Sequence, residues 1–381
     1  MNKKSKKKKG KNLQSVSFLL FIASGVLCGA IISYCLNKFT QFNSTTKSLL
    51  YFLSLIMVFV ASFVHTIIHE AGHLIFGLLS GYKFSSFRVF SFMILKEEGK
   101  FKFKRFSLAG TAGQCLMIPP DLVDGKVPVV WYNLGGCIIN IIAAIIFAVV
   151  AFFLRTILFL SVVLWIFAII GIAFAVVNGV PMRLGMIDND GYNAYSLTRT
   201  PKAIKSFWTT LRVNEQVARG VRFKDMPAEW FEVPEDEDMQ NSMVASIGVF
   251  ACNYLLDTKQ FEEAKCLIDH LLSIDSGLAD IYRKGLICER IYLELISEKS
   301  SKVIEELFTK EQKQFMKQMK RNPSIIRTEY IMALVWEKDM AKAEKTKIRF
   351  EKCIKYHPYQ SDIQSERELI EIAEKINCAQ Q

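Results

Sequence analysis

The chain has 381 residues, 51% hydrophobic and 22% charged, which excludes intrinsic disorder except at the N-terminus. Its nine scattered cysteines without a C-x-x-C pair indicate reduced thiols. Its net charge of +11 is unevenly spread, because residues 1–200 carry 20 Lys/Arg against 7 Asp/Glu and residues 201–381 carry 28 against 30. Since the basic half is also the apolar half, these numbers argue against a nucleic-acid partner and for a membrane protein.

Four apolar stretches are long enough to cross a bilayer, for which about 20 residues suffice. The predicted spans cover 12–37, 48–80, 127–154 and 156–182. A basic tail, 1–11, precedes the first span. That span is too long for a cleaved signal peptide and favours a retained anchor, and the tail is expected to contact anionic lipid headgroups.

Lysine and arginine collect at one side of these spans. The tail has seven and the 81–131 segment has eight, whereas the link between the last two spans has only Arg155. The positive-inside rule therefore places the tail, the 81–131 segment and everything after Met182 in the cytosol. We expect a multi-pass protein of a cell membrane, taken to be bacterial.

The segment between the second and third spans predicts a membrane-associated β-hairpin over 82–106. Lys100, Lys102 and Lys104 alternate with phenylalanines after a Gly-containing turn. Two roles remain open for the hairpin, which are simple anchoring at the membrane surface and capture of an extended segment by strand addition. The following Gly110–Gln114 is interpreted as a flexible linker, with a re-entrant loop near a site as the alternative.

Residues 201–381 predict an all-α cytosolic domain. Two parts of it, Asn253–Asp275 and Ala333–Ala343, resemble tetratricopeptide-type helical hairpins, with a bulky helix, a polar turn and a small residue in the next helix. An ordinary antiparallel bundle is the alternative. The expected role of this domain is to bind a protein partner or to gate access.

The chemistry is concentrated in an H-E-x-x-H motif, His69 to His73, at the cytosolic end of the second span. Residues i and i+4 share one face of a helix, so both imidazoles can reach one metal, with Glu70 beside them as a general base. An ionisable residue at membrane depth is costly and points to function. His65 cannot share a zinc with His73, which is about 12 Å away along the helix, so we expect an inward-facing polar residue rather than an outer-shell partner.

A catalytic zinc needs a third protein ligand. The last span ends in Asn178-Gly179-Val180-Pro181, and Asp188-Asn189-Asp190-Gly191 follows. With the H-E-x-x-H helix, this pattern resembles the site-2 protease family of intramembrane zinc metalloproteases over roughly residues 50–195. Gly135-Gly136 with Asn140 is similar to a less specific pattern of that family.

The resemblance implies one zinc on His69, His73 and Asp190. It also implies that Glu70 is the base toward a zinc-activated water and that Asn178 contacts the substrate or the oxyanion. The spacing departs from the family, because Asp190 follows Asn178 by twelve residues instead of about eight. Asp188 is therefore an alternative ligand, although Gly191 favours Asp190 by allowing a tight turn after it.

The predicted fold is an α-helical polytopic membrane protein of about four spans with a short β-hairpin, a 12–200 metalloprotease domain and an all-α, tetratricopeptide-like domain. The function that the resemblance implies is zinc-dependent cleavage of transmembrane or membrane-associated polypeptides, such as anti-sigma factors or peptide precursors. The alternative is a non-proteolytic membrane scaffold that retains the protease fold and recruits a partner through its helical domain. The stretched spacing between Asn178 and Asp190 favours this alternative.

Overall fold

The computed structural model describes residues 43–97, 99–106, 111–183, 188–297 and 300–379, with isolated positions between 23 and 34. The predicted tail and nearly all of the first predicted span lie outside the described residues. The chain divides into two compact units. The first unit comprises Met1–Lys83, Ala112–Cys115 and Pro128–Tyr195, and the second unit comprises Phe84–Thr111, Leu116–Val127 and Ser196–Gln381.

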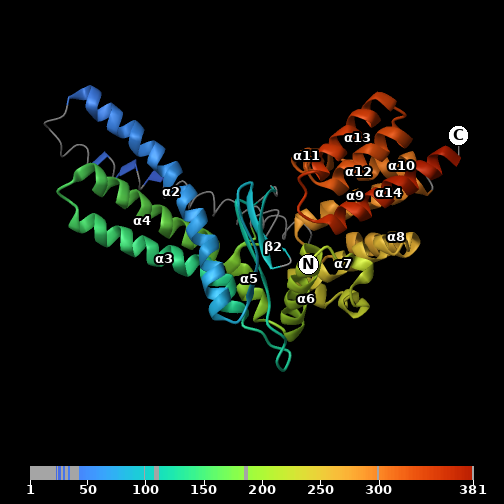
Figure 1. Ribbon diagram of the computed structural model, residues 1–381, viewed down its shortest axis with the longest axis horizontal. Coiled ribbons are helices and arrows are strands. Elements are labelled where there is room, and N and C mark those ends of the chain that lie inside the picture. The colour runs from blue at the N-terminus through green and yellow to red at the C-terminus, as the bar shows by residue number, and fades with distance from the viewer. Residues whose placement is uncertain are drawn as a thin grey trace. The chain divides into compact units, whose positions relative to one another are not determined.

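Three long helices form the body of the first unit and pack against one another (Figure 1). They are α2 (Ser44–Leu79), α3 (Val129–Phe153) and α4 (Leu158–Gly179). All three are long and apolar enough to span a bilayer, and only 22%, 28% and 39% of their apolar windows are buried within the protein. The outward faces thus present apolar side chains, as a membrane location requires. The three helices match the second, third and fourth predicted spans.

Small residues set the distance between α2 and α3. A Cβ on Gly72 would overlap the carbonyl oxygen of Gly135, and one on Gly135 would lie 2.6 Å from the carbonyl oxygen of Gly72. The two backbones therefore touch at the H-E-x-x-H motif, as small residues allow in helix pairs within membranes. Farther along α2, Ala61 packs with Val162 and Ile166 of α4 in a buried apolar cluster.

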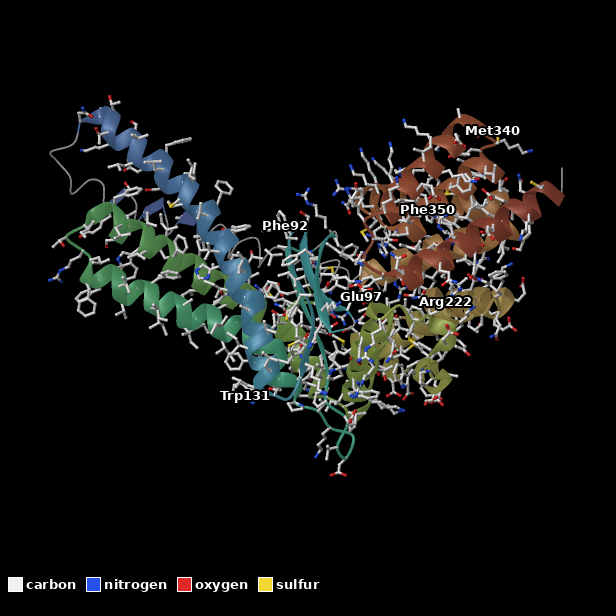
Figure 2. All side chains as sticks on the ribbon, in the orientation of Figure 1. Phe92, Glu97, Trp131, Arg222, Met340 and Phe350 are labelled. Carbon is white, nitrogen blue, oxygen red and sulfur yellow. The ribbon has the colours of Figure 1, made fainter. Side chains whose placement is uncertain are left out.

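A four-stranded sheet replaces the predicted hairpin. Its strand order is β3-β2-β1-β4, and β1 pairs with β2 and β2 with β3 in antiparallel register. The strands are β1 (Lys83–Val89), β2 (Phe92–Glu97), β3 (Lys100–Arg105) and β4 (Gly113–Ile118). Phe92, labelled in Figure 2, is exposed on β2, and Phe101 and Phe103 on β3 are 63% and 81% exposed.

The predictions for the hairpin and for the linker after it were each wrong. The stretch expected to form one strand turns at Phe90, whose φ of 52° is rare for a bulky residue. The Arg88 Nη1 donates to the Phe90 carbonyl at 2.9 Å and supports that turn. The linker interpretation of Gly110–Gln114 was also wrong, because Gly113 begins β4. The turn at Gly99, with a φ of 79°, is where the sequence predicts it.

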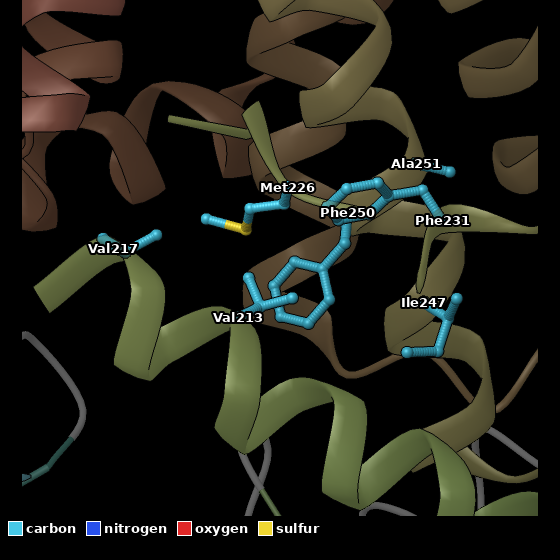
Figure 3. Close-up of a cluster of buried hydrophobic side chains, with 7 residues drawn as sticks. All are labelled: Val213, Val217, Met226, Phe231, Ile247, Phe250 and Ala251. Atoms are coloured by element: carbon cyan, nitrogen blue, oxygen red, sulfur yellow. The ribbon is translucent and has the colours of Figure 1, made fainter. Parts of the chain in front are cut away.

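The rest of the second unit is helical, as predicted. It contains α6 (Pro201–Ala218), η1 (Phe223–Asp225), η2 (Ala228–Phe231), η3 (Asp238–Gln240), α7 (Ser242–Asp257), α8 (Phe261–Ser273), α9 (Asp280–Ile296), α10 (Ser301–Leu307), α11 (Lys310–Gln318), α12 (Pro323–Ile331), η4 (Met332–Trp336), α13 (Met340–Ile354) and α14 (Gln360–Ala379). Figure 3 shows one of its cores, in which Phe250 of α7 and Phe231 lie near Val213 of α6.

Two helix pairs lie where the sequence suggests helical hairpins. Helices α7 and α8 contact each other across a turn in which Lys259 has a φ of 65°, and α12 with η4 contacts α13 across a turn in which Lys338 has a φ of 55°. Both turns thus place a lysine in the left-handed conformation. The tetratricopeptide type of these hairpins stays a prediction.

Candidate metal centre

Three ligand atoms from distant parts of the first unit converge on one point. His69 Nε2 lies 3.2 Å from His73 Nε2 and 2.9 Å from Asp190 Oδ2, and His73 Nε2 lies 3.4 Å from the same oxygen. The two histidines lie one helical turn apart on the same face of α2. Asp190 is the first residue of α5 (Asp190–Leu197). This is the ligand set that the resemblance implies.

The spacing fits a tetrahedral zinc. With bonds of about 2.0–2.1 Å, two ligands of such an ion are separated by roughly 3.3 Å. The three separations here, 2.9, 3.2 and 3.4 Å, are close to that value. The donor chemistry agrees, because His73 Nδ1 lies 2.8 Å from the carbonyl oxygen of Tyr132. A carbonyl only accepts, so Nδ1 carries the proton and Nε2 keeps its lone pair for a metal.

The carboxylate of Asp190 lies against both imidazoles. Its Oδ2 is 2.9 Å from His69 Nε2 and 3.4 Å from His73 Nε2. Two imidazole nitrogens and a carboxylate oxygen in contact thus form a donor set that suits a divalent cation.

The predicted base, Glu70, lies buried beside this centre. Its neighbour is Gly113, the first residue of β4, where a Cβ would overlap Glu70 Oε1. Gly113 is therefore glycine because the carboxylate occupies the space that a side chain would need. The segment read as a linker thus lies at the site.

Asp190 is positioned by a buried residue that the sequence reasoning missed, Asn189. Its Oδ1 accepts from the backbone N–H groups of Met182 (3.0 Å) and Tyr192 (2.9 Å), and its Nδ2 donates to the carbonyls of Val177 (2.8 Å) and Val180 (2.6 Å). One side chain thus joins the end of α4 to the start of α5. Its position as an N-cap before a helix is a signal that could have been read.

The alternative ligand, Asp188, has another partner. Arg183 and Asp188 form an antiparallel bridge and an ion pair at 3.5 Å. Asp190 is the carboxylate that lies at the histidines.

The structure does not connect Asn178 to the three ligand atoms by a hydrogen bond. Its Nδ2 donates to the Phe174 carbonyl one turn earlier in α4, at 3.0 Å. The glycine at position 191 is required for a reason other than the predicted one. A Cβ added there would overlap the carbonyl oxygen of Gly179. Close approach of α5 to α4, and not a special backbone conformation, requires glycine there.

Comparisons with protein-family models, with curated proteins and with solved structures each found no match. The assignment of a function therefore depends on the residues and distances above.

Proposed function

We propose that the chain is a membrane-embedded zinc endopeptidase of the site-2 protease type. The observation that carries the proposal is the convergence of His69, His73 and Asp190 beside Glu70, on a helix long and apolar enough to span a bilayer. A scaffold would have no need of a buried carboxylate next to such a donor set. The spacing that favoured a scaffold does not keep Asp190 from the histidines, because its Oδ2 lies 2.9 Å from His69 Nε2.

The roles follow from the donor set. His69, His73 and Asp190 would hold one zinc. When bound, the metal would lower the pKa of a water molecule and polarise the peptide carbonyl. Glu70 accepts the proton from the attacking water and passes it to the departing amide nitrogen. Burial of Glu70 against Gly113 fixes where that proton transfer occurs.

The substrate is a transmembrane or membrane-associated polypeptide with a locally unwound segment, because a helix sequesters its own carbonyls. Strand β4 lies at one edge of the sheet and begins at the Gly113 that touches Glu70. An extended segment added to β4 would satisfy its backbone hydrogen bonds next to the base. This supports β4 as the capture strand in place of the predicted hairpin.

The remaining parts have proposed roles in the membrane. The exposed Phe101 and Phe103 of β3 suit contact with the inner membrane surface. The tail and the second unit face the cytosol in this proposal, with the tail at anionic headgroups and the helices binding a protein partner. Asn178 contacts the substrate or the oxyanion after it exchanges its bond to Phe174.

The proposal is tested by comparing membranes that contain the wild type, Glu70→Gln or a control, Glu97→Gln. Glu97 is an acid on β2 that pairs with Lys102 at 3.0 Å. New protein N-termini are mapped by mass spectrometry. We expect termini within apolar segments in the wild type and in Glu97→Gln, reduced about 10²–10⁴-fold in Glu70→Gln. Undiminished cleavage in Glu70→Gln would contradict the proposal, and absence of cleavage in all three would favour the scaffold.

A further inference from the structure

A chain of hydrogen bonds leads from α4 to the metal centre through His65. His65 is fully buried one turn before His69, and its Nε2 lies 2.9 Å from the Phe167 carbonyl oxygen. Its Nδ1 lies 2.9 Å from Oδ1 of Asn140 on α3. The Nδ2 of Asn140 lies 3.1 Å from Nδ1 of His69. Three helices are thereby joined at one zinc ligand.

We propose that His65 and Asn140 form a relay that holds His69 in the tautomer and orientation required for a metal. The inference rests on the proposed zinc site, and both are positioning residues that act through His69. It replaces the sequence interpretation of His65 as a polar residue that only faces inward.

The Phe167 carbonyl determines the tautomer of His65, and through Asn140 that of His69. The Phe167 carbonyl can only accept, so His65 carries its proton on Nε2, and a neutral His65 then accepts at Nδ1. Asn140 can donate only through its NH₂ group. We therefore assign the amide with its NH₂ group toward His65, the reverse of the placement above, because the two ends of an amide are assigned from their hydrogen-bond partners. The amide oxygen then faces His69 and accepts from Nδ1–H. His69 Nε2 is left with its lone pair, directed at Asp190 and His73.

Packing fixes the relay in space. Gly171 of α4 leaves room for His65, since a Cβ there would lie 2.6 Å from His65 Cε1. The rings of Phe147, Phe167 and Phe174 surround His65 with centroids 5.9, 6.2 and 6.1 Å away. Hydrogen bonds in such apolar surroundings are strong, and an unpaired polar group there is costly. A merely structural His65 would not need to be linked to a ligand.

The test measures zinc affinity of the full chain in detergent by competition with a chelating dye. Asn140→Leu and His65→Leu are expected to weaken zinc binding about 10–100-fold, as loss of outer-shell partners does. His65→Gln keeps one donor and one acceptor and is expected to stay within about threefold of the wild type. The matched control is Asn133→Leu, because Asn133 is also buried in α3 but donates to Val129 of its own helix at 2.7 Å.

A second readout separates positioning from loss of fold. In the cobalt-substituted protein, the visible absorption reports the geometry around the metal. We expect the wild-type spectrum in His65→Gln and Asn133→Leu and an altered one in His65→Leu. Wild-type affinity and spectrum in His65→Leu, or equal losses in His65→Gln and His65→Leu, would overturn the relay alone. A wild type that binds no zinc would overturn the proposed function and the relay with it.

Discussion

Replacement of Gly136 by alanine tests how closely the metal centre is packed. Gly136 lies on α3 against the imidazole of His69, and an added Cβ would lie 2.6, 2.7 and 2.8 Å from ring atoms Cε1, Nδ1 and Nε2. The methyl group would thus meet the ring itself and not the end of a flexible chain. Ordinary contact begins at 3.4 Å, so the imidazole must move by roughly 0.6–0.8 Å, several times the tolerance of about 0.2 Å for a zinc ligand.

The expected consequence is loss of His69 from the ligand set. Because loss of an outer-shell partner already weakens metal binding about 10–100-fold, we expect at least about a 100-fold loss of zinc affinity in Gly136→Ala, or about 2.7 kcal/mol. The substitution itself favours the helix by about 1 kcal/mol. A weaker α3 therefore cannot cause the loss.

Dye competition in detergent measures the affinity, with Gly179→Ala as the matched control. Gly179 ends α4, and a Cβ there would make ordinary contacts with Cys137 at 3.4 and 3.5 Å. We expect the control to bind zinc as the wild type does. Equal affinities for Gly136→Ala and the wild type would refute the packing argument, and equal losses in both variants would indicate a general disturbance of the helices.

Two further predictions concern Asn189 and Glu366. Asn189→Ala removes four hydrogen bonds that position Asp190, so its zinc affinity should fall. The control, Asn178→Leu, should bind zinc as the wild type does. A loss of zinc affinity in Asn178→Leu but not in Asn189→Ala would contradict the proposed positioning. Burial raises the pKa of Glu366 to about 7, against the attraction of Arg327. Because this folded-state value exceeds the unfolded one, the contribution of Glu366 to stability is present below about pH 4.5 and is lost as the pH rises through 7. Glu366→Gln should flatten that part of the pH dependence of the urea midpoint, measured by tryptophan fluorescence, and an unchanged profile would refute the assignment.

Much of the first unit could be predicted from the sequence because its signals are local. Apolar runs without charges mark α2, α3 and α4, and the i, i+4 spacing of His69 and His73 places two ligands on one helix face. The choice between Asp188 and Asp190 is different. It depends on the bridge between Arg183 and Asp188, which no local sequence pattern predicts.

The parts that could not be predicted depend on contacts between segments far apart in the sequence. Gly113 is glycine because Glu70, more than forty residues earlier, fills its side-chain space. His65 could not be assigned from helix spacing alone, since its partners are Asn140 on α3 and Phe167 on α4. The strand break at Phe90 was missed for a different reason, because a phenylalanine gives no turn signal. Its left-handed conformation is supported by a local hydrogen bond from Arg88, two residues earlier.

The zinc content of the purified full chain tests the central claim most directly. It is measured by elemental analysis after metal-replete purification of the wild type, Asp190→Ala and Asp188→Ala. We expect one zinc per chain in the wild type and in Asp188→Ala, and loss of zinc in Asp190→Ala. A wild type without zinc, or a chain that keeps zinc in Asp190→Ala and loses it in Asp188→Ala, would contradict the account.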